Sequence, residues 1–358
     1  MVDAGGIAVA CSGLSKSFDD EQVVDGLDLA IAEGSIVGLI GPSGCGKTTT
    51  VRLLVGLLEP TAGSATVWGT PSTDLSASQR QRIGYLPQIP ALFPDLSLWE
   101  NLSFHASMYG LRLRRRHRLH HVLEWVELDE HRDKKVREVS GGMQRRLALA
   151  AAFVHDPSLV FLDEPTAGID PILRSTFWEQ FREMRDEGRT LCVTTQYVGE
   201  AAYCDHVGLL SDGELLLIDT PENLRKAAFE GEVVDIELSR EVDPSELEPL
   251  GRVDGVLSGP ELVSSRVWRL VVEDADQAID RLDAELERST LPIIETREHI
   301  VDFDEAFVRV IERHRSSDGA PDADADADVD VDVDADAEPA GGAAATWAAP
   351  AGSQAQAR

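Results

Sequence analysis

Residues 41–48 of the chain are Gly41-Pro42-Ser43-Gly44-Cys45-Gly46-Lys47-Thr48, which is the spacing of a phosphate-binding loop. The loop follows an apolar run at residues 35–40 and precedes a helical pattern at residues 49–58. Glycines allow successive backbone N–H groups to point at an anion, and the start of a helix adds its positive end. Lys47 would supply a mobile cation for phosphate groups, and Thr48 a hydroxyl ligand for Mg²⁺. A simple glycine turn between a strand and a helix would explain the glycines, but neither Lys47 nor Thr48.

The composition is that of a folded protein. With 358 residues, the chain has room for two domains or for one large domain with an extension, and 43% hydrophobic residues is enough for a core. No apolar run approaches the roughly 20 residues that cross a bilayer, and residues 1–10 lack a basic region leading into an apolar one. We therefore expect a cytoplasmic protein. Four cysteines lack metal-ligand spacing and are expected to be free thiols: Cys11, Cys45, Cys192 and Cys204.

The net charge of −31 is extreme. The tail at residues 316–358 holds ten of the 64 acids and one arginine, so most of the negative charge lies elsewhere. Aspartate is abundant and only five of the 33 basic residues are lysine, which suggests a halophilic protein whose self-repulsion is screened by salt. The acidity disfavours nucleic acid as a partner, because neutralising phosphates requires a basic surface.

Three residues outside the loop are candidates for contacts with a nucleotide or its metal. Phe18 precedes the loop and could stack on a base, although a lone phenylalanine is more often part of a core. Val24 is considered for the same reason, its place ahead of the loop. Gln88 ends a buried strand pattern at residues 82–88 and could offer an amide oxygen to a metal or a water. An exposed loop glutamine is the simpler alternative for Gln88.

Residues 97–138 have a helical pattern that contains the dense basic run at residues 112–118. Such a run is most often a solvated helix face, and a docking surface for a partner or for anionic headgroups is the sharper alternative. His117, His120 and His121 lie in or beside this run without a metal-ligand pattern, so we expect them at the surface.

A second helix start follows at Ser140-Gly141-Gly142. Ser140 is a natural N-cap, and the two glycines permit another group to approach the helix end closely. A capped helix start explains this stretch on structural grounds alone. The functional alternative is a second helix N-terminus that binds a phosphate.

Two acids end the apolar run at residues 159–162. Burying adjacent carboxylates is costly unless a cation or a reacting water accounts for them. We therefore assign Asp163 to a metal and Glu164 to polarising a water. Asp170 follows in a turn, and a further apolar strand pattern at residues 190–196 ends in Gln196.

The composition changes at about residue 231. Residues 231–315 are expected to form a small α+β unit, with strands at 233–238 and 267–272 and helices at 275–288 and 304–313. No chemistry is identified in this unit. The alternating Asp-Ala and Asp-Val repeat at residues 321–337 and the Ala-rich end predict disorder for residues 316–358.

Four motifs occur here in the order and spacing of the ATP-binding cassette. They are the phosphate loop at residues 41–48, Gln88 after a strand, the Ser-Gly-Gly at residues 140–142 and the Asp-Glu at residues 163–164. Over roughly residues 7–220 the chain resembles the ATP-binding subunit of an ABC transporter, closest to the drug- and antibiotic-exporter type. The resemblance implies an α/β fold of the P-loop NTPase class, with a mixed sheet, an antiparallel β-subdomain and a helical subdomain. On this basis residues 1–230 form the ATP-binding domain, with the helical subdomain at about 89–157 and the accessory domain at 231–315.

The resemblance also assigns roles to individual residues. The catalytic residues are Glu164 and Gln196, and the acid of the D-loop is Asp170. The signature, which acts on the nucleotide of a partner cassette, is Ser140, Gly141 and Gly142. The Mg²⁺ ligands are Thr48, Gln88 and Asp163. The ATP contacts are Phe18, Val24, Gly41, Pro42, Ser43, Gly44, Cys45, Gly46, Lys47, Thr48, Thr49 and Gln88.

In the family two cassettes face head to tail, so the signature of one closes over the ATP of the other. One chain holds one loop and one Ser-Gly-Gly helix, which implies a dimer, expected to be a homodimer. The expected activity is Mg-ATP hydrolysis that drives transport, with export favoured, through a separate membrane permease. The chain would then lie in the cytoplasm, peripheral on the inner face of the membrane.

Two positions depart from the family pattern. Met143 replaces the usual glutamine of the signature, as in exporter-like members, and Gln196 replaces the switch histidine. A glutamine can hydrogen-bond a γ-phosphate but cannot carry a positive charge or shuttle a proton. The alternative to a transport ATPase is therefore an ATP-gated clamp or regulatory cassette protein with little hydrolysis. A soluble cassette acting on ribosomes or DNA is disfavoured by the single cassette and the acidity.

Overall fold

The computed structural model describes residues 6–19, 21–111, 115–289 and 291–317. These residues form two compact units, and each is considered by itself. The first unit contains Met1–Val37 and Lys47–Thr195, and the second contains Gly38–Gly46 and Gln196–Ser317. The disorder predicted for residues 316–358 is wrong for residues 316 and 317, which end helix α10 (Phe303–Ser317). Residues 318–358 and the basic residues 112–114 lie outside the described part of the chain.

The first unit contains an antiparallel sheet in the order β2-β1-β4-β5. Its strands are β1 (Ile7–Phe18), β2 (Glu21–Ala32), β4 (Ala62–Val67) and β5 (Thr70–Pro71). Buried and exposed residues alternate through the second half of β2, as expected for a sheet with one face on the core. The sequence predicts strands at residues 7–10 and 23–31, and both are confirmed, with β1 extending further than predicted, to Phe18.

The largest sheet is mixed and has the order β10-β9-β3-β8-β7-β6. Strands β6, β7 and β8 run parallel, and Asp163 of β7 lies beside Thr194 of β8. The strands not yet given are β3 (Ile36–Ile40), β6 (Ile83–Leu86), β7 (Leu159–Asp163), β8 (Thr190–Thr195), β9 (His206–Ser211) and β10 (Glu214–Asp219). All residues of β3, β7 and β8 are buried, which explains their continuous apolar sequence pattern.

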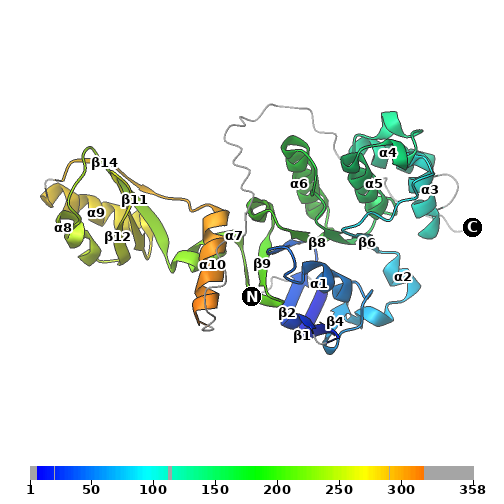
Figure 1. The fold of residues 1–358 in the computed structure, drawn as a ribbon, viewed down its shortest axis with the longest axis horizontal. Helices are drawn as coiled ribbons and strands as arrows, with labels where there is room; N and C mark the ends of the chain where they lie inside the picture. Colours follow the sequence, from blue (N-terminus) through cyan, green and yellow to red (C-terminus); the bar gives the residue numbers. More distant parts are fainter. Residues whose placement is uncertain (1–5, 20, 112–114, 290, 318–358) are drawn as a thin grey trace, which may run out of the picture. The chain divides into compact units, whose positions relative to one another are not determined.

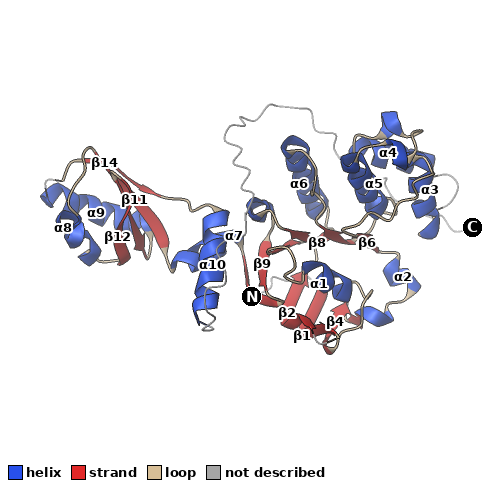
Figure 2. Ribbon diagram, in the orientation of Figure 1, coloured by secondary structure: helices blue, strands red, loops and turns tan. Residues whose placement is uncertain are grey.

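The helices of the first unit include a group of three, α3, α4 and α5, with no strand between them (Figure 2). The α-helices are α1 (Lys47–Leu54), α2 (Ala77–Arg80), α3 (Leu98–Met108), α4 (Arg116–Trp125), α5 (Gly141–Phe153) and α6 (Pro171–Asp186). Short 3-10 helices are η1 (Ser72–Asp74), η2 (Asp129–His131) and η3 (Val136–Glu138). The helix predicted at residues 49–58 is shorter than expected and starts earlier. It ends before Gly56, which has a φ of 76° and where a Cβ would lie 1.9 Å from the carbonyl oxygen of Ser72.

The second unit contains a four-stranded antiparallel sheet in the order β12-β13-β11-β14, with α9 packed against it (Figure 1). These strands are β11 (Glu232–Leu238), β12 (Val256–Ser264), β13 (Val267–Val272) and β14 (Ile293–Glu298). Its helices are η4 (Val198–Tyr203), α7 (Pro221–Phe229), α8 (Pro244–Leu247), η5 (Glu248–Arg252), α9 (Ala275–Ser289) and α10 (Phe303–Ser317). The two strands and two helices predicted here are confirmed. The pattern did not reveal the two edge strands, β14 and β12, the latter interrupted by Gly259 and Pro260.

No helix among the described residues is both long and apolar enough to cross a membrane.

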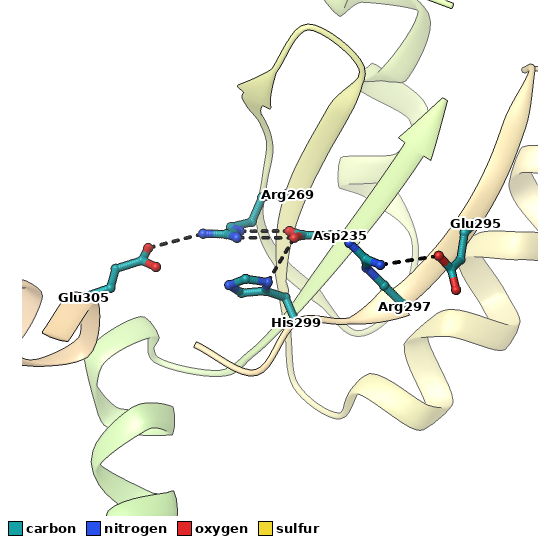
Figure 3. A network of polar contacts seen from close by, with 6 residues as sticks. All are labelled: Asp235, Arg269, Glu295, Arg297, His299 and Glu305. Atoms are coloured by element: carbon teal, nitrogen blue, oxygen red, sulfur yellow. Dashed lines mark hydrogen bonds and ion pairs between the residues drawn. The ribbon is translucent and has the colours of Figure 1, made fainter. Parts of the chain in front are cut away.

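A buried ion pair joins neighbouring strands of the second unit (Figure 3). Asp235 of β11 and Arg269 of β13 are register partners, and two hydrogen bonds of 2.8 and 3.2 Å connect their side chains. Arg269 also lies 3.2 Å from Glu305 of α10, and Nδ1 of His299 lies 3.1 Å from Asp235. The hydrogen bonds to Asp235 raise the pKa of Arg269. The pair therefore ties the sheet to α10.

We expect Asp235→Ala to lower the local stability of β11 and β13 by about 3 kcal/mol, because Arg269 would keep its charge in a buried site without its main partner. Hydrogen–deuterium exchange of peptides from these two strands measures the change. The matched control is Glu295→Ala, which breaks the exposed pair with Arg297 (3.5 Å) and should cost less than about 1 kcal/mol. Equal effects of the two variants would show that burial of the Asp235–Arg269 pair does not set its contribution to stability.

Candidate active site

The first half of the phosphate loop belongs to the second unit and requires its glycines. A Cβ on Gly41 would lie 2.2 Å from the carbonyl oxygen of Leu210 and 2.6 Å from Sγ of Cys45. Gly44 and Gly46 have φ values of 85° and 96°, which L-residues with a side chain rarely adopt. The loop conformation thus depends on glycine for two different reasons, close approach and positive φ.

Gln196 lies beside this loop. Its side-chain oxygen accepts a hydrogen bond of 3.1 Å from the hydroxyl of Ser43. Both Ser43 and Gln196 are exposed, and Pro42 and Gly44 are exposed as well. The structure therefore brings Gln196, expected to contact the γ-phosphate, to the loop that was expected to bind phosphates.

The second half of the loop opens helix α1 in the first unit. Lys47 is only 5% exposed. The Thr48 hydroxyl donates a hydrogen bond of 3.1 Å to Oδ1 of Asp163, and Thr49 is half-buried. Since Gly46 and Lys47 share a peptide bond, the two halves of the loop are continuous in the chain.

Asp163 is fully buried at the end of β7. Its Oδ1 accepts hydrogen bonds from the hydroxyls of Thr48 and Thr194, the latter at 2.7 Å. Its Oδ2 is buried and has no hydrogen-bond partner among the described residues. Leaving one oxygen of a buried carboxylate unpaired is costly, so the site is well suited to a cation or to one of its water ligands.

These residues fit Mg²⁺, which binds through one or two carboxylates and completes its shell with water and phosphate oxygens. Thr48 and Asp163 would hold it. No group of three or more His, Cys, Asp or Glu side chains in the described part of the chain could hold a metal without such outside ligands. A magnesium ion here would therefore arrive with a phosphate ligand.

Glu164 has a strained backbone, with a φ of 51°. Its N–H donates to both the carbonyl oxygen and the hydroxyl of Thr194, each at 3.0 Å. Its carboxylate remains half-buried and accepts a hydrogen bond of 3.3 Å from the side-chain amide of Gln88. The Glu164 side chain therefore lies beside Gln88.

Ser140 caps helix α5, accepting a hydrogen bond of 3.3 Å from the N–H of Met143. The predicted N-cap is confirmed. A Cβ on Gly141 would meet nothing within 4 Å, and one on Gly142 would lie 3.4 Å from the carbonyl oxygen of Gly168. The fold of this unit therefore does not require glycine at Gly141, which is consistent with a role in contacts with another molecule.

Asp170 is the N-cap of α6 and accepts a hydrogen bond of 3.0 Å from the N–H of Leu173. Phe18 is 44% exposed at the end of β1, and the ammonium group of Lys16 lies 5.1 Å from its ring centroid. Val24 is fully buried in β2. A base contact remains a prediction for Phe18, and for Val24 the burial favours a role in the core.

The three histidines near the basic run do not form a site. His117 is exposed as expected, while His120 and His121 are half-buried. Nδ1 of His120 lies 2.8 Å from Oδ1 of Asp129. Burial lowers the pKa of His121, and nearby Arg118 lowers it further.

Two residues at the site were not predicted from the sequence. Thr194 contacts both Asp163 and Glu164, and its signal was present as a hydroxyl residue at the end of an apolar strand. Arg145 donates hydrogen bonds to four carbonyl oxygens around the same acids. Its position in a helix that begins at the signature offered no comparable signal.

We expect Thr194→Val to lower the local stability of β7 and β8 by about 2 kcal/mol, because Asp163 loses a hydrogen-bond donor in a buried site. Hydrogen–deuterium exchange of peptides from β7 and β8 in Mg²⁺-free buffer measures this loss. Thr194→Ser keeps the hydroxyl and is expected to stay close to the parental value. If the two variants exchange alike, the hydroxyl does not compensate the buried carboxylate.

Sequence comparisons with known proteins identify the family of this chain. The profile of the family described as "ABC transporter" matches residues 24–167. Nod factor export ATP-binding protein I of Burkholderia lata is 38% identical over 225 residues, which are 62% of this chain and 74% of that protein. The probable multidrug ABC transporter ATP-binding protein YbhF of Escherichia coli strain K12 is 37% identical over 232 residues, 64% of this chain but only 40% of YbhF.

Solved structures show the same fold. A dimeric ATP-binding cassette in a post-hydrolysis state, bound to ADP and Pi, superimposes with a TM-score of 0.55 and 25% sequence identity, covering 59% of this chain and 98% of the other. The predicted fold class, an ABC cassette of the P-loop NTPase type, is thereby confirmed. This chain belongs to the family of ABC transporter ATP-binding proteins.

Proposed function

We propose that this chain binds and hydrolyses Mg-ATP and so drives transport, in the direction of export, through a separate membrane permease. One observation carries the chemical part of the proposal. The buried carboxylate of Asp163 has one oxygen without a hydrogen-bond partner in the described part of the chain, and its other oxygen lies 3.1 Å from the Thr48 hydroxyl. It is adjacent in sequence to the half-buried carboxylate of Glu164. This is the set of groups that phosphoryl transfer to water requires.

Each group has a distinct task in this proposal. Backbone N–H groups of residues 41–48 and the ammonium of Lys47 bind the phosphates, and Phe18 stacks on the base. Thr48 and Asp163 would hold Mg²⁺, which when bound would supply positive charge to offset the charge developing on the phosphate oxygens. The Glu164 carboxylate orients the attacking water and accepts its proton. Gln196 donates a hydrogen bond to the γ-phosphate.

The partner in this proposal is a second copy of the chain. Ser140, Gly141 and Gly142 form a capped helix start, and the open space at Gly141 suits the approach of a phosphate bound to the other copy. The dimeric state of the solved cassette supports the same arrangement. Asp170, which caps α6, would lie in the segment between the two copies.

The transport part of the proposal draws on the relatives. One is named for multidrug transport and another for Nod factor export, and both are named as ATP-binding proteins. We assign residues 1–230 to the ATP-binding domain, with the helical subdomain at about 89–157, and residues 231–315 to an accessory domain. The chain would work on the cytoplasmic face of the membrane, where the permease selects the substrate.

An ATP-gated clamp with little hydrolysis is the second candidate. It is favoured by one observation. The residue that accepts the hydrogen bond from Ser43 is Gln196, whose side-chain amide does not titrate. Because an amide cannot take up a proton at this position, proton transfer would rest on Glu164 alone. Sustained release of phosphate by the purified chain at high salt excludes the clamp.

We expect Glu164→Gln to bind ATP with parental affinity and to lower kcat by at least about 100-fold, because the amide cannot accept a proton from water. Steady-state phosphate release and titration with a fluorescent ATP analogue measure the two quantities. Lys47→Ala is the matched comparison and should lose nucleotide affinity as well as turnover. Parental turnover by Glu164→Gln would refute the assignment of the base, and undiminished ATP binding by Lys47→Ala would refute the nucleotide site.

A further inference from the structure

The guanidinium group of Arg145 is buried behind the two acids, with 5% of the residue exposed. Its Nη1 donates to the carbonyl oxygens of Pro87 at 2.8 Å and Gln88 at 2.7 Å. Its Nη2 donates to the carbonyl oxygen of Glu164 at 2.6 Å and also to that of Asp163. One side chain thus connects two main-chain segments that are far apart in the sequence.

All four acceptors are carbonyl oxygens, so this is not a conventional ion pair. Burial lowers the pKa of Arg145, while the nearby charges of Asp163 and Glu164 raise it. A buried charge of this kind is costly unless its hydrogen bonds are made. The rigid, planar fork of arginine can donate to several acceptors in fixed directions, which a lysine ammonium on a flexible stem cannot do. The contacts therefore hold the two segments at one separation.

The two segments that Arg145 connects also contact each other through their side chains. The amide of Gln88 lies 3.3 Å from the carboxylate of Glu164, and this contact joins the residue expected to contact ATP and Mg²⁺ to the proposed base. Because the Arg145 fork holds the main chain of both residues, the distance between their side chains depends on it. A misplacement of about 1 Å in such a pair is enough to lower a reaction rate by about 100-fold.

Arg145 also belongs to the helix that begins at the signature. It lies in α5, little more than one turn after the N-cap Ser140. A helix of this length moves as a rigid element, so a displacement of Ser140 would be passed to Gln88 and Glu164 through the fork. The next residue, Arg146, points elsewhere, and its Nη1 donates to the carbonyl oxygen of Val126 at 3.2 Å.

We propose that Arg145 is a positioning residue that holds Gln88 and Glu164 at the separation needed for ATP hydrolysis and links both to the signature helix. The proposal rests on the function proposed above. The four carbonyl oxygens that accept from Arg145 lie outside residues 41–48, which bind the phosphates. Loss of the fork should therefore lower the rate of hydrolysis and leave nucleotide binding intact.

The test compares Arg145→Lys with the matched control Arg146→Lys in the full chain. Both variants keep the positive charge, and only the first removes the fork. We expect Arg145→Lys to lower kcat for Mg-ATP by about 10-fold to 100-fold, with KM and ATP affinity within about twofold of parental values. Arg146→Lys should leave all three quantities close to parental values. A parental kcat for Arg145→Lys, or equal losses of kcat and of ATP affinity, would overturn the proposal.

A second measurement separates positioning from a general loss of structure. If Arg145 acts through Gln88, then Gln88→Ala should lower kcat in the parental chain but have little further effect in Arg145→Lys. Fully additive losses would overturn the proposal. If Arg145→Lys does not fold, Arg145→Gln replaces it in both measurements, because its neutral side chain avoids an unpaired buried charge.

Failure of the wider function gives a different result. An absence of ATP turnover in the parental chain, or turnover that survives Lys47→Ala, refutes the proposed ATPase and the role of Arg145 together. Parental turnover that requires Lys47, combined with an unaffected Arg145→Lys, refutes the role of Arg145 alone.

Discussion

The buried carboxylate of Asp163 is the constraint around which the site is built. A carboxylate without access to water is tolerated only when hydrogen bonds or a cation compensate it. Thr48 and Thr194 donate to one oxygen, and the other has no hydrogen-bond partner among the described residues. Through these contacts Asp163 connects the start of α1, the end of β7 and the end of β8. The start of α1 and the acids are thereby held together by contacts within the chain itself.

A second charge of opposite sign is buried behind the first. Arg145 is compensated by four carbonyl oxygens rather than by a carboxylate, so its burial fixes the main chain around Asp163 and Glu164. Glu164 itself is kept in a strained conformation by two hydrogen bonds from its N–H to Thr194. Strain of this kind persists only where the surroundings enforce it, and it is common at functional sites. The main chain of Glu164 is therefore fixed, while its half-buried carboxylate stays able to meet a water.

In the second unit, a buried carboxylate is compensated by a direct ion pair. Asp235 and Arg269 neutralise each other across β11 and β13, and Glu305 joins them from α10. Helix α10 is also the last described element before the acidic tail. An Asp–Arg pair adds nothing to the net charge of −31, so that charge comes from acids outside this pair. The surface charge is then left to determine solubility and the choice of partners.

The sequence by itself determined the class of fold, the phosphate loop, the adjacent acids, the serine N-cap and the main elements of the C-terminal unit. These features are local, because loop geometry, capping and strand burial each leave a pattern within a few residues. Only the tertiary structure showed that Thr194 supports both acids, that Gln196 meets Ser43, and that Arg145 joins Gln88 to Glu164. Such contacts connect residues far apart in the chain, and those of Arg145 end on main-chain carbonyls, which every residue has. A hydrogen bond to a carbonyl oxygen leaves no trace in the identity of the acceptor residue, so no sequence pattern could have revealed it.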